Sequence, residues 1–175
     1  MTAAMAQESA TKDADPHHYH NEQDNTAQYL SFTLGSEEYG VDILRVQEIR
    51  GWEPVSRIPN VPFYEKGVVN LRGSIVPIID LREKLRLKFT DYTPLTVVVV
   101  LQTRDDNKTR TMGVVVDSVS DVITVDKTDI QDAPDFGAKV SNEFINGLVS
   151  VDERMVILLN ADKLLKLEEL ETGEA

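Results

Sequence analysis

The chain has 175 residues, 41% of them hydrophobic, and a formal net charge of −12 at pH 7. This length can bury a core without metals or disulfide bonds, and the lack of cysteine excludes disulfide frameworks, cysteine nucleophiles and thiolate metal sites. No apolar run reaches the roughly 18 residues of a membrane span, and the start of the chain lacks a secretory signal pattern. We therefore expect a soluble cytosolic protein without membrane insertion.

The negative charge is concentrated at the two ends. Residues 1–26 hold five acidic residues and one lysine, and residues 168–175 hold four acidic residues, so these tails supply −8 of the −12. The rest of the chain is nearly balanced, which argues against a nucleic-acid-binding surface. We expect a disordered N-terminal tail and an acidic C-terminal tail. The tail histidines His17, His18 and His20 could bind a metal, but such clusters are usually solvated, and no metal or cofactor is predicted.

Alternating apolar residues predict a β-hairpin at the start of the folded part, with strands over 30–34 and 39–43 and a turn at 35–38. Further strands rich in valine and isoleucine are expected at 67–71, 75–79, 96–101, 112–116, 121–125, 147–151 and 155–159. Short helices are expected after Asp80 and after Asn160, both good N-cap residues. Many short strands separated by turn signals predict an all-β fold of barrels or a sandwich.

The chain contains an internal repeat. Residues 64–80 line up with residues 144–160 without a gap, at an offset of 80, including a glycine in each copy. A repeat of this spacing is too long for a solenoid unit and fits two similar β subdomains, approximately residues 27–90 and 91–167, with a groove between them.

A second register of the repeat, at an offset of 73, places Val46 on Val119 and Ile49 on Val122. Val46 and Ile49 fit either the end of a strand or one helical turn. Apolar residues matched in this way are usually core. They would also form two equivalent apolar rims where two barrels face each other.

The repeat differs at one turn, where the first copy has Arg72-Gly73-Ser74 and the second has residues 152–154, Asp-Glu-Arg. A turn requires only polar residues or glycine, so nothing structural demands an arginine. Arg72 is therefore a candidate contact residue. A solvated turn arginine without a role is an equally good interpretation.

The segment 72–88 is locally basic and would suit an acidic protein partner. A solvated helix face explains residues 82–88 at least as well.

Catalytic motifs are lacking. There is no glycine-rich phosphate loop, and all three histidines lie in the N-terminal tail, so no Ser-His-Asp relay is expected in the folded part. Asp80, Asp117 and Asp121 could pair for acid–base chemistry, but their spacing fits capping and turn roles better. We predict no catalytic residue, which disfavours a rival interpretation as a small β-barrel hydrolase.

Approximately residues 28–167 resemble the CheW-like family of bacterial chemotaxis coupling proteins. The resemblance is carried by five segments in the family's order, 32–43, 46–51, 70–82, 113–122 and 147–165. It implies two SH3-like five-stranded barrels with a groove between them. It also implies a non-enzymatic scaffold that couples methyl-accepting chemotaxis receptors to the histidine kinase CheA, recruited to membrane-bound receptor arrays. A fragment of the kinase's own regulatory domain, which has the same fold, is the alternative within this fold.

The resemblance also assigns contact residues. The receptor's cytoplasmic tip would dock at or near Val46, Ile49, Arg72, Val97, Gly113 and Val122. Glu48 would contact the regulatory domain of CheA. A helix that docks in a groove uses apolar anchors and a few charges that fix its register, so Val46, Ile49 and Val122 would be anchors and Arg72 the register charge.

Overall fold

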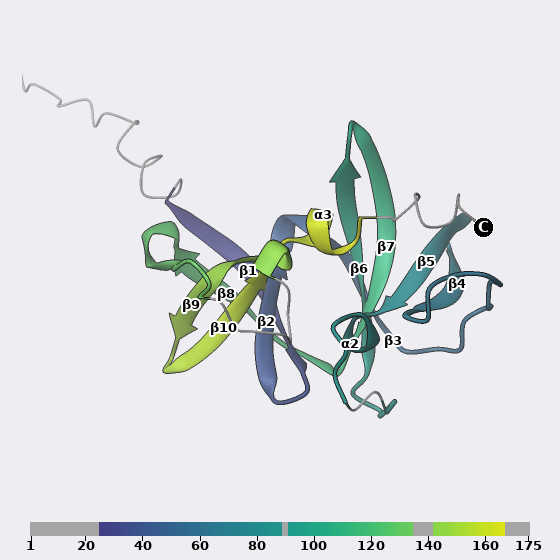
Figure 1. Cartoon of the computed structure of the whole chain (residues 1–175), viewed down its shortest axis with the longest axis horizontal. Coiled ribbons are helices and arrows are strands. Elements are labelled where there is room, and N and C mark those ends of the chain that lie inside the picture. The colour runs from purple at the N-terminus through teal and green to yellow at the C-terminus, as the bar shows by residue number, and fades with distance from the viewer. Residues whose placement is uncertain (1–24, 89–90, 135–141, 167–175) are drawn as a thin grey trace, which may run out of the picture.

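The computed structural model describes residues 25–88, 91–134 and 142–166 (Figure 1). The predicted tails and the histidine cluster, apart from the last two residues of the N-terminal tail, lie outside the described residues. The ten strands are β1 (Thr26–Leu34), β2 (Glu37–Asp42), β3 (Val46–Gly51), β4 (Glu65–Leu71), β5 (Ser74–Asp80), β6 (Val97–Asp105), β7 (Lys108–Val116), β8 (Ser118–Asp126), β9 (Ile145–Val151) and β10 (Arg154–Leu159). The short helices are α2 (Leu81–Lys84), α3 (Ala161–Leu164) and the 3-10 turns η1 (Ile43–Arg45), η2 (Lys127–Asp129) and η3 (Asn142–Phe144).

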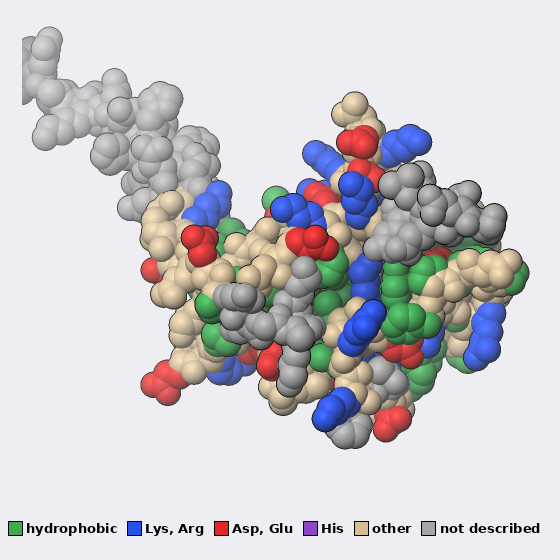
Figure 2. All heavy atoms as spheres, in the orientation of Figure 1, with side chains coloured by type: hydrophobic (Ala, Val, Ile, Leu, Met, Phe, Trp, Pro, Cys, Tyr) green, Lys and Arg blue, Asp and Glu red, His purple; other side chains and the backbone are tan. Residues whose placement is uncertain are grey.

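The strands form two curled five-stranded sheets that lie side by side (Figure 1), and hydrophobic side chains reach the surface of both among Lys, Arg, Asp and Glu side chains (Figure 2). Sheet A has the order β8-β1-β2-β10-β9, and sheet B has the order β3-β6-β7-β5-β4. The predicted all-β fold with two five-stranded subdomains is confirmed. Residues 46–49, which fit either a strand end or a helical turn in the sequence, form part of strand β3.

The predicted division into residues 27–90 and 91–167 is wrong as a description of the two sheets. Residue 90 falls between β5 and β6, which both belong to sheet B. Each sheet instead combines the first two strands of one repeat with the last three strands of the other. The reason is that the chain crosses between the sheets twice, at η1 and at Asp117 between β7 and β8.

The repeat itself appears in the strand registers. β3 pairs with β6 through a β-bulge at Gln47, and β8 pairs with β1 through a bulge at Ser120, the position that the offset of 73 predicts. Gly40 lies opposite Leu158 in the parallel pair β2–β10, just as Gly113 lies opposite Ile78 in β7–β5. The two halves therefore have the same local structure although their strands are shared between two sheets.

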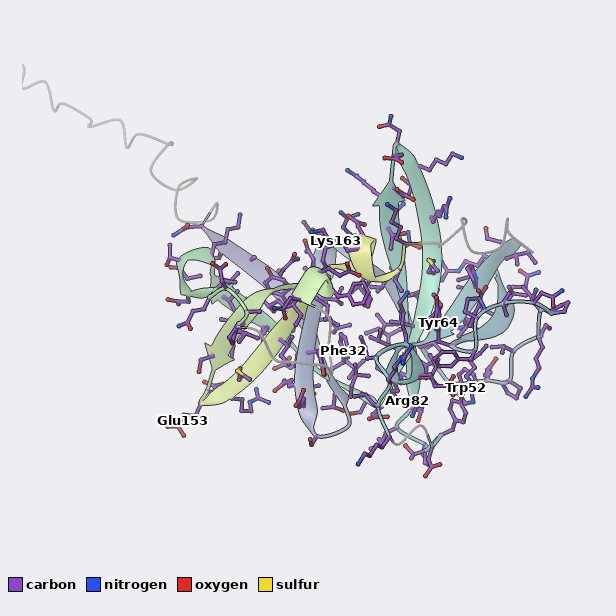
Figure 3. All side chains as sticks on the ribbon, viewed as in Figure 1. Phe32, Trp52, Tyr64, Arg82, Glu153 and Lys163 are labelled. Carbon is purple, nitrogen blue, oxygen red and sulfur yellow. The ribbon has the colours of Figure 1, made fainter. Side chains whose placement is uncertain are left out.

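Three apolar clusters form the core. One lies within sheet B and contains Val76, Ile78, Val98, Val100 and Val115. One lies within sheet A and contains Ile123, Val125, Val149, Val156 and Leu158. The largest draws on both sheets, and we call it the cluster between the sheets. It includes Phe32, which is labelled in Figure 3, together with Tyr39, Val99, Leu101, Met112 and Leu159. Successive residues of a strand point to opposite faces, so the run of valines in β6 serves two clusters at once.

Both predicted helices are present and capped as expected. The Asp80 carboxylate accepts a hydrogen bond from the backbone N–H of Arg82 at the start of α2, at 3.0 Å. The Asn160 side chain accepts one from the N–H of Lys163 in α3, at 3.1 Å. Capping of this kind satisfies N–H groups that have no partner within the helix.

Candidate partner-binding surface

Two exposed apolar residues occupy equivalent places at the edges of the two sheets. Ile49 lies on β3, an edge strand of sheet B, directly opposite Val99, and Val122 lies on β8, an edge strand of sheet A, directly opposite Leu30. Directly opposed side chains share a face, and Val99 and Leu30 both belong to the cluster between the sheets. Ile49 and Val122, 44% and 43% exposed, therefore border that cluster where it meets solvent. We call them the rim pair.

Glu48 points to the opposite face of the same edge strand. It lies across from Val100, whose side chain belongs to the cluster within sheet B. Its carboxylate oxygens lie 3.8 Å from the guanidinium of Arg72 and 3.8 Å from that of Arg50. Because successive residues alternate, β3 presents an apolar residue to one side and a charged residue to the other. The structure thus joins Arg72 to Glu48 and not to the rim pair.

The turn that carries Arg72 explains its exposure. Arg72 and Gly73 have φ values of 53° and 88°, and the Asn70 side chain accepts a hydrogen bond from the N–H of Gly73 at 2.9 Å. A left-handed backbone conformation is adopted most easily by glycine and, among the other residues, by Asn and Asp. At the equivalent turn Asp152 has φ 49°. An arginine is therefore not the residue that this turn geometry favours, and its side chain is 87% exposed.

A cavity of about 320 Å³ opens beside these charges, within sheet B. Val98, Val100 and Ile78 form part of its apolar lining, and Arg50 and Asn70 are among its polar residues. The Glu48 face of β3 therefore adjoins a hollow with apolar walls and a polar margin.

The other three predicted contact residues are less accessible. Val46 and Val97 are half-buried and pack against the cluster between the sheets. Gly113 is buried in β7, and a Cβ added there would lie 2.6 Å from Ile78 and 2.8 Å from Val98. Gly113 therefore allows close packing inside sheet B, and its assignment at or near the receptor contact stays a prediction.

A buried charge cluster was missed by the sequence analysis. Arg82 is fully buried and binds the carboxylate of Asp80 through Nε at 3.0 Å and Nη2 at 2.9 Å. Its Nη1 donates to Asp117 at 2.9 Å and to the backbone oxygen of Asp91 at 2.7 Å. Burial alone would lower the pKa of Arg82, but the hydrogen bonds to the two carboxylates raise it above its usual value. The expectation that Arg82 belongs to a solvated helix face is therefore wrong.

Two aromatic residues complete this cluster. Tyr92 lies with its ring centroid 5.1 Å from the Arg82 guanidinium and stacks on Trp52 at 4.3 Å, and Figure 3 shows Trp52 and Arg82 in the same part of sheet B. Because Arg82 holds both Asp80 and Asp117, these carboxylates serve as structural ligands of a cation. No signal in the sequence distinguishes this arrangement from a surface charge pair.

The phenol of Tyr92 should make stability depend on alkaline pH. Burial and the nearby Asp80 carboxylate raise the pKa of Tyr92 from 10.0 to about 12. The folded state therefore favours the neutral phenol, and this contribution to stability, complete below pH 10, is lost as the pH rises through 12. We expect the free energy of unfolding, measured with urea across this range, to fall less steeply in Tyr92→Phe. Parallel profiles for the two proteins would contradict the assignment.

Among the described residues, no helix has the length and apolar character to span a membrane. Within the same residues, no three His, Asp or Glu side chains gather as a metal site would require.

The fold and the surface together define a class of protein, a β module of two sheets. Its edge strand β3 presents an apolar residue of the rim pair on one face and a charged residue on the other. Comparison with known proteins gives the family. Residues 28–169 match the CheW-like domain, and the chain belongs to that family. The resemblance expected from the sequence is thereby confirmed.

Similar proteins span the same part of the chain. A relative from Klebsiella aerogenes, named Chemotaxis protein CheW, is 50% identical over 143 residues, which cover 82% of this chain and 84% of the relative. A protein of the same name from Rhizobium meliloti is 38% identical over 144 residues, 82% and 90% of the two chains. The crystal structure of the scaffolding protein TtCheW from Thermoanaerobacter tengcongensis has a TM-score of 0.72 at 26% identity, and covers 81% of this chain and 89% of that one.

Proposed function

We propose that the chain is a non-enzymatic adaptor of chemotaxis, which couples methyl-accepting chemotaxis receptors to the histidine kinase CheA. Its relatives bear the name of a chemotaxis protein, and a similar solved structure is described as a scaffolding protein. It would act in the cytoplasm, recruited to membrane-bound receptor arrays. The adaptor supplies binding surfaces, and phosphorylation chemistry belongs to the kinase.

The observation that carries this proposal is the rim pair. Ile49 and Val122 expose apolar side chains at equivalent edges of the cluster between the sheets, one from each sheet. A helical receptor tip that docks along this border would find an apolar anchor on either side. The half-buried Val46 and Val97 would extend the contact inward.

Glu48 would serve the kinase contact because it points away from the rim pair. A strand that alternates its side chains can contact one partner with Ile49 and another with Glu48. The regulatory domain of CheA would then meet the charged edge that contains Glu48, Arg50 and Arg72. The Arg72 guanidinium lies 3.8 Å from Glu48, so Arg72 would lie at the boundary between the receptor contact and the kinase contact.

Co-sedimentation tests the proposal. The full chain should sediment with receptor-containing membranes and CheA, and each of the variants Ile49→Asp and Val122→Asp should reduce its recovery with receptor. Failure of the wild-type chain to join the complex would refute the proposed function.

Arg72→Asp is expected to weaken receptor binding about ten-fold, because it replaces an exposed register charge by its opposite. The fold should be retained, since Asp152 adopts the same left-handed backbone at the equivalent turn. The reciprocal variant Asp152→Arg is the control and should bind receptor as wild type. Unchanged receptor pull-down by Arg72→Asp would refute a role for this residue.

A further inference from the structure

Each of the two chain crossings between the sheets is tied to a helix by an ion pair. At the first crossing, Arg45 at the end of η1 binds Asp162 of α3, with Nη2 and Oδ2 2.8 Å apart. At the second, Asp117 binds Arg82 of α2 at 2.9 Å. In Figure 1, α3 lies between the two sheets.

The helix partners of the two pairs are matched by the internal repeat and have opposite charges, whereas the partners at the crossings are displaced by one position. The offset of 80 places Arg82 on Asp162, and the offset of 73 places Asp117 on Leu44, the neighbour of Arg45. In both halves, therefore, the second residue of a short helix forms an ion pair with a residue at the crossing. This helical residue is the cation Arg82 in α2 and the anion Asp162 in α3. An ion pair between a helix and a crossing in both halves, with the charges exchanged, indicates that the crossing is a point that requires restraint.

The two pairs differ in their access to solvent. Arg82 is fully buried and its partner Asp117 is 31% exposed, whereas both Arg45 and Asp162 are partly exposed, at 27% and 32%. Salt therefore screens the Arg45–Asp162 pair more, because neither of its partners is buried. Oδ1 of Asp162 also accepts a hydrogen bond from the backbone N–H of Arg104 in β6, at 2.8 Å. One carboxylate thus connects η1, α3 and β6.

The position of Arg45 gives this pair a consequence for binding. β3 begins at the next residue and carries Glu48 and Ile49. Among the described strands β3 pairs only with β6, so the Arg45–Asp162 pair adds a restraint at the end of β3 that follows the crossing. We infer that Arg45 and Asp162 are positioning residues, which hold the edge strand β3 and so fix the placement of Ile49 relative to Val122. The effect on receptor binding rests on the proposed function.

Two single variants and their combination test this inference. Asp162→Asn removes the charge and keeps an amide oxygen that can accept from the N–H of Arg104, and Arg45→Gln removes the cation. Each should accelerate amide hydrogen exchange in β3 about two- to five-fold at low salt and weaken receptor binding by a similar factor. The double variant should be no worse than either single variant, because both remove the same interaction. High salt should reduce the difference from wild type.

A matched control is available in sheet B. Lys66 and Glu83 form an ion pair at 2.5 Å with similar exposure, 26% and 21%, but it joins β4 to α2. Glu83→Gln should leave exchange in β3 unchanged.

The readouts separate the possible failures. Unchanged exchange in β3, or additive effects of the two substitutions, would overturn the restraint whether or not the chain binds receptor. Faster exchange with wild-type receptor affinity would overturn the positioning role. If wild type itself binds no receptor, the proposed function fails, and exchange in β3 still decides whether the pair restrains the strand.

Discussion

Replacing Arg82 by methionine should lower the free energy of unfolding by about 3–5 kcal/mol, the cost of removing one partner from a buried ion pair. Arg82 and Asp80 both have fully buried side chains, so water cannot take the place of the lost guanidinium. Asp117 and the backbone oxygen of Asp91 would lose a donor as well. Urea unfolding at neutral pH measures the effect.

Arg86 provides the matched control, because it lies four residues further along and is exposed. Arg86→Met should change the free energy of unfolding by less than about 0.5 kcal/mol. Arg82→Lys should fall between the two, because lysine keeps the charge and loses the bidentate geometry. A loss below about 1 kcal/mol in Arg82→Met would contradict the structural role of the cluster.

Gly67→Ala is expected to destabilise the protein by about 3 kcal/mol or more, because it combines a backbone strain with an atomic overlap. Gly67 has φ 147°, and a Cβ built on it would lie 2.1 Å from the backbone oxygen of Ser56. The two hydrogen bonds between Ser56 and Val68, at 3.1 and 2.9 Å, hold that oxygen in place. The chain can relieve the overlap only by breaking this bridge.

Thermal or urea unfolding of Gly67→Ala should be compared with that of Gly51→Ala. A Cβ at Gly51 meets no atom within 4 Å, so this control should stay within about 0.5 kcal/mol of wild type. Gly147, the repeat partner of Gly67, would place a Cβ 2.8 Å from the oxygen of Gln131, and its alanine variant should also be destabilised. Equal stability of Gly67→Ala and Gly51→Ala would show that the Ser56 segment moves freely.

Local elements could be predicted from the sequence because their signals are local. Alternation identified the first hairpin, richness in valine and isoleucine identified further strands, and Asp80 and Asn160 identified the helix starts. The repeat identified the equivalence of Ile49 and Val122, which the matching bulges and strand registers bear out. Their binding role remains a proposal.

Strand partners could not be predicted in the same way. The choice between pairing β2 with β10 and pairing it within its own repeat depends on contacts more than a hundred residues apart. A sequence repeat suggests contiguous subdomains, and it carries no information on exchange of strands between them. The burial of Arg82 has a similar cause, since its second carboxylate, Asp117, is brought to it only by the fold. The burial of Gly113 has the same cause, because its packing partners Ile78 and Val98 come from other strands.

The interleaved topology also has a consequence for synthesis on the ribosome. All five strands of sheet B lie between residues 46 and 116, so this sheet can assemble as soon as that stretch has emerged. Sheet A contains both β1 and β10, so the hairpin of β1 and β2 can pair with β10 only after residues 154–159 have been made. Because closing so long a loop is slow, we expect β1 and β2 to complete their pairings after sheet B has formed.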